Sequence, residues 1–277
     1  MTAYVTTIHA GSIKDNHDVT KFLDIQLSNF RKNTNEPHKF YVGVYGDDYK
    51  KCCEEYKSPD ITFVDLTDIQ QDHWIRMNFL YENIQEEFKE DDLLLFIDAD
   101  AWPIKDWVKP VDSLLEEHAV VAVERRENPE PLLKEEHKPY PHPTFFAVKA
   151  KFWKENYEKG LRWALRIEDS IQTAGPTIKH WLKDNGYTSY PLLRTNCINI
   201  HPLYYGIYGD IVYHHGAGTR PKYDSADIWL RTGLNPAVDL DLRYPMILDF
   251  NQRISDMVLE EIKQNDLFVN VYLLGKL

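Results

Sequence analysis

The sequence has few cysteines and no long hydrophobic run. Its 277 residues contain only Cys52, Cys53 and Cys197, and an odd set with two adjacent members does not form the disulfide framework of a secreted protein. No apolar run approaches the roughly 20 residues of a membrane-spanning helix, and the first residues lack the basic flank and apolar core of a signal peptide. These absences predict a soluble, cytoplasmic protein, with peripheral attachment to a membrane as the alternative.

Positive charge is also scarce. Lysine and arginine total 32 against 44 aspartate and glutamate residues, so the formal net charge is −12. Basic side chains that neutralise phosphates supply most of the affinity for nucleic acids, and no basic run alternates with aromatic residues here. Nucleic acid is therefore not an expected partner, and any phosphate must be bound by a local group. Hydrophobic residues make up 43% of the chain, which is enough for a buried core.

Residues 1–125 alternate between strand-like and helix-like patterns. Such alternation predicts an α/β fold with a mostly parallel central sheet covered by helices on both faces. In open sheets of this kind, ligands bind beyond the carboxyl ends of the strands. The expected strands are 4–9, 39–45, 61–64, 93–97 and 119–123, and the expected helices are 19–31, 49–56 and 73–88.

The chain changes character after residue 125. Prolines interrupt a charged stretch between residues 125 and 143, which indicates a long loop, either a solvated connector or a mobile lid. Strand 144–148 and the helices 151–165 and 177–185 are expected after it. We interpret residues 1–277 as one domain with two halves that meet near residue 125.

The expected strand 93–97 runs directly into Asp98-Ala99-Asp100. Because alternate residues of an extended chain point to the same side, the two carboxylates can converge at the edge of the sheet. At about 4 Å they repel by about 1 kcal/mol in water and about 4 kcal/mol near a protein surface. Mg²⁺ or Mn²⁺ between them would remove this repulsion and keep positions for phosphates. The alternative is a buried strand that is followed by acidic residues without a metal-binding role.

A second copy of the spacing serves as a control. Asp239-Leu240-Asp241 follows Asn235-Pro236-Ala237-Val238 rather than a strand pattern, so we interpret it as loop. The context of the motif, not its spelling, therefore carries the prediction of a metal site.

A later extended segment leads into His214, His215 and a glycine-bearing turn. Glycine lets the backbone approach an anion closely. We prefer His215 as a metal ligand because it directly precedes the turn, and a structural role for the histidine pair is the alternative. Arg220 and Lys222 follow, and such side chains suit the charge of a diphosphate.

In their order along most of the chain, these segments resemble a GT-A glycosyltransferase, the family of nucleotide-sugar transferases with a metal-binding Asp-x-Asp. The most specific part of the resemblance is the Asp-x-Asp after an apolar strand. The resemblance implies a Rossmann-like fold with a nucleotide-binding half (1–124) and an acceptor-binding half (125–277) that includes a smaller acceptor-side subregion. The matching segments are strand 4–9, Phe96 to Asp100, Thr144 to Val148, Glu168-Asp169 and His215-Gly216.

The resemblance also implies an activity. A hexosyl- or pentosyltransferase of this kind moves a sugar from a nucleotide-sugar donor to a hydroxyl of a glycan or glycoconjugate. A UDP-sugar is favoured over a GDP-sugar because it is the commoner donor of metal-dependent members. Mn²⁺ or Mg²⁺ would bind Asp98, Asp100 and His215, and Asp169 would act as the base of an inverting reaction.

Further residues are expected to contact the substrates. Trp102, two residues after Asp100, is expected to face the acceptor because an aromatic ring offers a flat apolar surface to a sugar. The alternatives are core packing for the aromatic residues, a solvated helix position for Arg76 and a salt bridge for Asp169. The expected donor contacts are Thr7, His9, Asp47, Arg76, Asp98, Arg220 and Lys222.

Two other classes remain open. A noncatalytic carbohydrate-binding, transferase-like protein would keep the fold without needing the carboxylate pair. Another metal-dependent phosphate enzyme would use the same motif, but dehalogenase-like enzymes carry it near the N-terminus. Sugar nucleotidyltransferases have a glycine-rich, arginine-containing signature after the first strand, where this chain has Gly11 alone. The sequence leaves the oligomeric state open.

Overall fold

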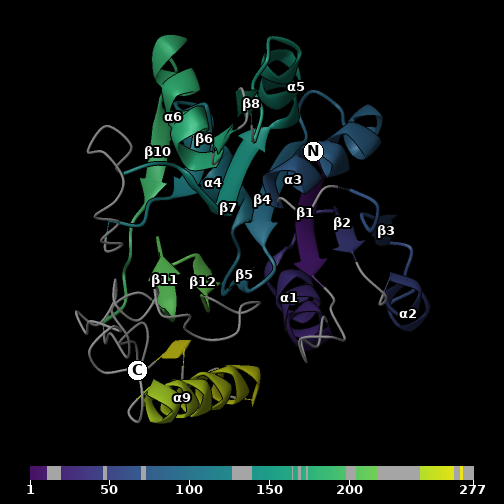
Figure 1. Ribbon diagram of the computed structural model, residues 1–277. Coiled ribbons are helices and arrows are strands. Elements are labelled where there is room, and N and C mark those ends of the chain that lie inside the picture. The colour runs from purple at the N-terminus through teal and green to yellow at the C-terminus, as the bar shows by residue number, and fades with distance from the viewer. Residues whose placement is uncertain are drawn as a thin grey trace.

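The centre of the protein is a mixed β-sheet, shown in a computed structural model of the chain (Figure 1). Its strands are β1 (Ala3–Ala10), β2 (His38–Tyr45), β3 (Ile61–Asp65), β4 (Leu93–Asp98), β6 (Val120–Val123), β7 (His142–Lys149) and β10 (Ser189–Leu192). The structure describes residues 1–10, 20–45, 49–69, 73–126, 139–163, 165–167, 170–172, 174–197, 204–216, 244–264 and 269–270.

The sheet is seven-stranded, in the order β10-β6-β7-β4-β1-β2-β3. β1 pairs in parallel with β2 and with β4. The pairs β2–β3 and β6–β10 are also parallel. β7 lies between β4 and β6 and pairs antiparallel with both. The predicted α/β fold with a mostly parallel sheet is confirmed, and the later strand β7 enters its centre in the opposite direction.

Helices cover both faces of the sheet, as the alternation of patterns predicted. α1 (Thr20–Asn33), α2 (Tyr49–Glu55) and α4 (Val108–Leu114) pack on one face, and α3 (His73–Ile84), α5 (Ala150–Glu158) and α6 (Ala174–Asp184) on the other. In β4, Leu93, Leu95 and Ile97 join the first layer, while Leu94 and Phe96 join the second. Each such fully buried side chain contributes about 1.5–3 kcal/mol to folding, so β4 is anchored from both sides.

A smaller subregion continues from the end of β4. β5 (Ala101–Pro103), β11 (Gly206–Tyr208) and β12 (Val212–His214) form a three-stranded sheet in the order β11-β12-β5. Helix α9 (Tyr244–Gln264), yellow in Figure 1, lies beside this sheet. Aromatic and aliphatic residues of α1, the small sheet and α9 share one buried cluster, which includes Phe22, Trp102, Tyr213 and Leu259. This cluster joins the C-terminal helix to the region that follows Asp98 and Asp100.

Two predicted helices are shorter than their patterns indicated. The helix expected at 151–165 ends at Glu158, because Gly160 adopts a positive φ of 108° that terminates the helix, and residues Leu165–Ile167 form strand β8, paired with β9 (Ser170–Gln172). The helix expected at 73–88 ends at Ile84 and continues as the 3₁₀ helix Gln85–Glu87. Seven of the described elements had no counterpart among the expected ones: β5, α4, β8, β9, β10, β11 and α9.

Within the described part of the chain, no helix combines the length and apolar character needed to cross a bilayer. The loop expected between residues 125 and 143 lies largely outside the described residues, since positions 127–138 are not among them.

Candidate metal site

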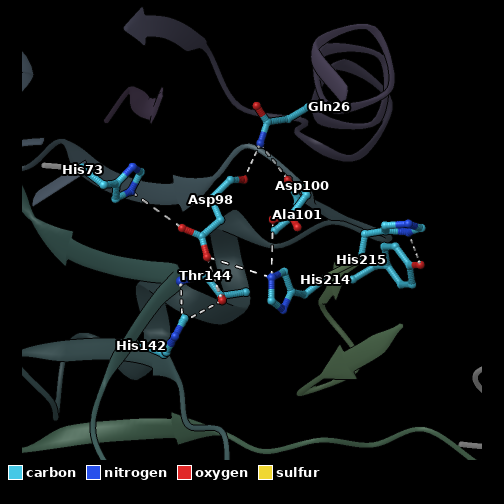
Figure 2. Close-up of polar contacts among 10 residues, drawn as sticks. Gln26, His73, Asp98, Asp100, Ala101, His142, Thr144, His214 and His215 are labelled. Carbon is cyan, nitrogen blue, oxygen red and sulfur yellow. Dashed lines mark hydrogen bonds and ion pairs between the residues drawn. The ribbon is translucent and has the colours of Figure 1, made fainter. Parts of the chain in front are cut away.

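Asp98 and Asp100 lie at the carboxyl end of β4, where the chain passes into β5. Their side chains point toward His214 (Figure 2). The Nε2 atom of His214 lies 3.4 Å from Oδ1 of Asp100 and 4.0 Å from Oδ2 of Asp98. One ligand atom from each of these residues lies within 4.8 Å of the others. The predicted convergence of the two carboxylates with an imidazole is therefore present in the fold.

The pairing of strands explains which histidine arrives. β12 runs antiparallel to β5, and His214 is opposite Ala101, next to Asp100 in the chain. His215 points the other way, because neighbouring residues of an extended chain face opposite sides. Its Nδ1 lies 3.0 Å from the Tyr213 hydroxyl and its Nε2 lies 2.7 Å from Oγ of Ser255 in α9. The expectation that His215 reaches the carboxylates is corrected: His214 occupies that place.

The three side chains fit a divalent cation. Ligand atoms about 2.1 Å from an octahedral ion lie roughly 3–4 Å apart, and the distances of 3.4 and 4.0 Å around His214 are in this range. Two carboxylates with one imidazole suit Mn²⁺ better than Mg²⁺, which keeps to oxygen ligands. The other ring nitrogen of His214, Nδ1, is buried and has no hydrogen-bond partner in the described residues. Nε2 is thus the nitrogen that faces the carboxylates.

A polar layer supports Asp98 from the side of β7. The hydroxyl of Thr144 lies 3.0 Å from Oδ2 of Asp98 and 2.7 Å from Nδ1 of His142. The Thr144 N–H donates to the same Nδ1 at 3.1 Å. Loss of solvation, with the charge of Arg125 adding to it, holds the pKa of His142 well below its usual value, so the ring is neutral and its nitrogen accepts. The single hydroxyl proton of Thr144 is shared between this nitrogen and Asp98.

A third histidine completes the surroundings of Asp98. The Nε2 atom of His73, the first residue of α3, lies 4.0 Å from Oδ1 of Asp98. Asp98 therefore has an imidazole on each side and a hydroxyl at one oxygen (Figure 2). Its side chain is 21% exposed, against 10% for Asp100, so Asp98 is the more accessible of the two carboxylates to an incoming ligand.

Thr144→Val should weaken Mn²⁺ binding by about 10-fold or more, because hydrogen bonds to metal ligands typically contribute 10–100-fold to affinity. Valine keeps the branched shape of this fully buried strand residue and removes only the hydroxyl. Thr6→Val is the matched control, since the Thr6 hydroxyl donates to the Leu95 carbonyl at 2.8 Å, away from the carboxylate side chains. Titration of the free Mn²⁺ signal in both variants measures the difference. Equal affinity of the two variants for Mn²⁺ would show that Thr144 does not support metal binding.

Several predicted contacts are buried rather than presented to a ligand. Trp102 is fully buried. The centroid of its ring lies 5.0 Å from the ring centroid of Tyr213 and 6.5 Å from that of Phe22. The expectation that it faces the acceptor is corrected, because β5 turns this side chain into the core shared with α1 and α9. Thr7 and His9 are 1% and 2% exposed, so this structure offers neither of them to the donor.

The remaining predicted contacts stay predictions. Arg76 is buried in α3, stacks its guanidinium 3.4 Å from the ring centroid of Tyr45, and donates to the Ile69 carbonyl at 3.3 Å. Its Nε has no hydrogen-bond partner among the described residues. The other expected site residues lie outside the described ones: Asp47, Asp169, Arg220 and Lys222.

Four residues of the site were not among the predicted ones: His73, His142, Thr144 and Gln26. Gln26 had a signal, because it is a polar residue on the apolar face that Phe22, Leu23, Leu27 and Phe30 define in the expected helix 19–31. The other three residues had no such signal in the sequence. They reach Asp98 only because α3 and β7 pack next to β4 in the fold.

The sequence matches no protein-family model and no curated protein. Solved structures similar to the chain include the glycosyltransferase GlyE of Streptococcus pneumoniae TIGR4, at 14% identity and a TM-score of 0.40, over 69% of this chain and 45% of GlyE. The galactosyltransferase LgtC, in complex with donor and acceptor sugar analogues, is similar at 15% identity and a TM-score of 0.37, over 55% of this chain and 59% of LgtC.

A 4-diphosphocytidyl-2C-methyl-D-erythritol synthase from Anaerococcus prevotii DSM 20548 is also similar, at 15% identity and a TM-score of 0.45, over 69% of this chain and 88% of the synthase. This chain covers less than two thirds of GlyE and of LgtC. All of these TM-scores are below 0.5, so the function of the chain must be inferred from its own site residues.

Proposed function

We propose that this chain is a metal-dependent glycosyltransferase that moves a sugar from a nucleotide-sugar donor to a hydroxyl of a glycan or glycoconjugate. The convergence of Asp98, Asp100 and His214 at the carboxyl end of β4 carries the proposal. This edge of an open α/β sheet is where such folds bind ligands. In a chain of net charge −12, an anionic donor needs a local source of positive charge, and a bound cation supplies it.

The residues at the end of β4 and in β7 have separate proposed roles. Asp98, Asp100 and His214 hold the cation, with Mn²⁺ favoured by the mixed oxygen and nitrogen ligands. A divalent cation at this point stabilises the negative charge that develops on the nucleoside diphosphate as the bond to the sugar breaks. Thr144 holds one oxygen of Asp98, which restricts the carboxylate before any ligand arrives.

The donor and acceptor contacts outside the described residues complete the proposal. Arg220 and Lys222 carry charges suited to the diphosphate, and the resemblance to GT-A transferases implies that Asp47 contacts the base or the ribose. Arg76, which the structure does describe, is a further proposed donor contact from α3. Asp169 is the proposed base that removes the proton of the acceptor hydroxyl in an inverting reaction. A UDP-sugar is the proposed donor, with a GDP-sugar as the alternative.

Thermal unfolding provides the first test. Mn²⁺ together with UDP should raise the melting temperature by roughly 5–10 °C, because a ligand at about 100 times its Kd stabilises the folded state by about 2.7 kcal/mol. UDP without Mn²⁺ should give a much smaller shift, since the diphosphate then meets two bare carboxylates. GDP with Mn²⁺ tests the nucleotide preference in the same experiment. A shift with free sugar alone would instead favour the noncatalytic carbohydrate-binding alternative.

A panel of nucleotide sugars with Mn²⁺ tests the reaction itself. The proposal expects Mn²⁺-dependent release of nucleoside diphosphate, by transfer to an acceptor or by slow hydrolysis. Release of pyrophosphate from a nucleoside triphosphate would indicate a nucleotidyltransferase. Hydrolysis of a generic phosphoester would indicate a phosphatase. Either of these products, without nucleoside diphosphate release, contradicts the proposal.

A further inference from the structure

Gln26 is a buried amide in the apolar face of α1. It is 1% exposed and lies among Phe22, Leu23, Leu27 and Phe30, which are all buried. Burying an amide without hydrogen bonds is unfavourable, so a glutamine at this position needs partners that satisfy it. Its partners lie outside the helix, in the turn that follows β4 and near the end of β1.

The amide nitrogen of Gln26 joins both ends of that turn. Nε2 donates to the carbonyl of Asp98 at 2.9 Å and to the carbonyl of Ala101 at 2.7 Å (Figure 2). An amide has two N–H groups, and two carbonyl acceptors use both. These bonds assign the orientation of the amide, so its Oε1 accepts from Nε2 of His9 at 3.0 Å. His9, at the end of β1, thereby holds the amide with its donors toward the turn.

A further carbonyl of the turn is bonded from the other side. The N–H of His215 donates to the carbonyl of Asp100 at 2.9 Å, next to the pairing of His214 with Ala101. The backbone at Asp98, Asp100 and Ala101 is thus tied to α1 and to the segment after β12. Because side-chain direction follows from the backbone that carries it, these ties decide where the two carboxylates point.

We propose that Gln26 is a positioning residue for the divalent cation site. Its amide fixes the turn that presents Asp98 and Asp100, and His9 fixes the amide. This inference rests on the proposed function, since it concerns the same cation. The Gln26 amide bonds to backbone carbonyls and to His9, so it acts on affinity through the backbone of the turn.

Gln26→Met tests this inference, because methionine has a similar length and no hydrogen-bonding amide. The Kd for Mn²⁺ alone, measured from the free Mn²⁺ signal, should rise by about 10–100-fold. Asn33→Leu is the matched control. Asn33 lies in the same helix, and its Nδ2 donates at 2.9 Å to the carbonyl of Pro103, at the far end of β5. Both variants lose hydrogen bonds of a buried or partly buried side-chain amide, so both should melt at lower temperatures. Asn33→Leu should nevertheless keep the Kd of the wild type for Mn²⁺.

The outcomes separate the inference from the proposed function. If wild-type protein does not bind Mn²⁺, the metal-dependent function is overturned and the inference with it. If wild-type protein binds Mn²⁺ and Gln26→Met binds it equally well despite a lower melting temperature, Gln26 is only a structural residue and the inference alone is overturned. Should Gln26→Met fail to fold, His9→Phe decides: it keeps both donors of Gln26 but releases the amide, and an unchanged Kd would overturn the inference.

Discussion

Asp100→Asn should lower the rate of sugar transfer by about a thousandfold and remove measurable Mn²⁺ binding, while the protein remains folded. Stabilisation of leaving-group charge by a bound cation contributes several kcal/mol to the transition state, and each 1.4 kcal/mol is a factor of ten in rate. Asparagine has the shape of aspartate but lacks the negative charge that attracts the cation. Steady-state rates and Mn²⁺ titration of the purified variant measure both effects.

The stability of the metal-free variant should move in the opposite direction to its activity. Asp98 and Asp100 both offer a carboxylate oxygen to one small region, so their charges repel when no cation is present. Asp100→Asn removes this repulsion, and the variant should melt at the same or a higher temperature than metal-free wild type. A site that exists only for structure would show the reverse, a loss of stability.

Asp91→Asn is the control for Asp100→Asn. Asp91 is exposed and precedes β4, so the control changes the net charge equally near the other end of the same strand. It should keep the wild-type rate. Full activity of Asp100→Asn with added Mn²⁺ or Mg²⁺ would refute the role assigned to Asp100.

His214→Gln and His215→Gln should have different effects although the residues are neighbours: the first on Mn²⁺ binding, the second on stability. His214→Gln should weaken Mn²⁺ binding by at least about 100-fold, more than the loss of a residue that only supports a ligand. His215→Gln should lower the free energy of unfolding by about 1–3 kcal/mol, because the buried hydroxyls of Tyr213 and Ser255 lose their ring partner. That loss corresponds to a fall of roughly 2–10 °C in melting temperature.

The pair of variants is its own control, because each removes one imidazole from adjacent positions. Mn²⁺ titration and thermal unfolding are measured on both. If His215→Gln loses the metal and His214→Gln loses stability, the pairing of β12 with β5 is shifted by one residue, since such a shift turns every side chain of the strand to its opposite face.

The pattern of residues along the chain was sufficient to predict the α/β class and the edge at which the site lies. A continuous apolar run such as Leu93 to Ile97 is typical of a strand that is covered on both faces, and the two burial layers of β4 confirm it. The carboxylates directly after that run must emerge at the carboxyl end of the strand. These are local relations, set by residues that are neighbours in sequence, and a single chain shows them without any knowledge of its distant contacts.

The choice between His214 and His215, the burial of Trp102 and the role of Gln26 depended on the tertiary structure. Each is decided by contacts between segments far apart in the chain: β12 with β5, β5 with α1 and α9, and α1 with the turn after β4. Two adjacent histidines have equal local chemistry, and only the register of an antiparallel pair decides which of them meets the carboxylates. Hydrophobic patterning fixes which face of an element is buried, but it does not state which residue of another element lies opposite.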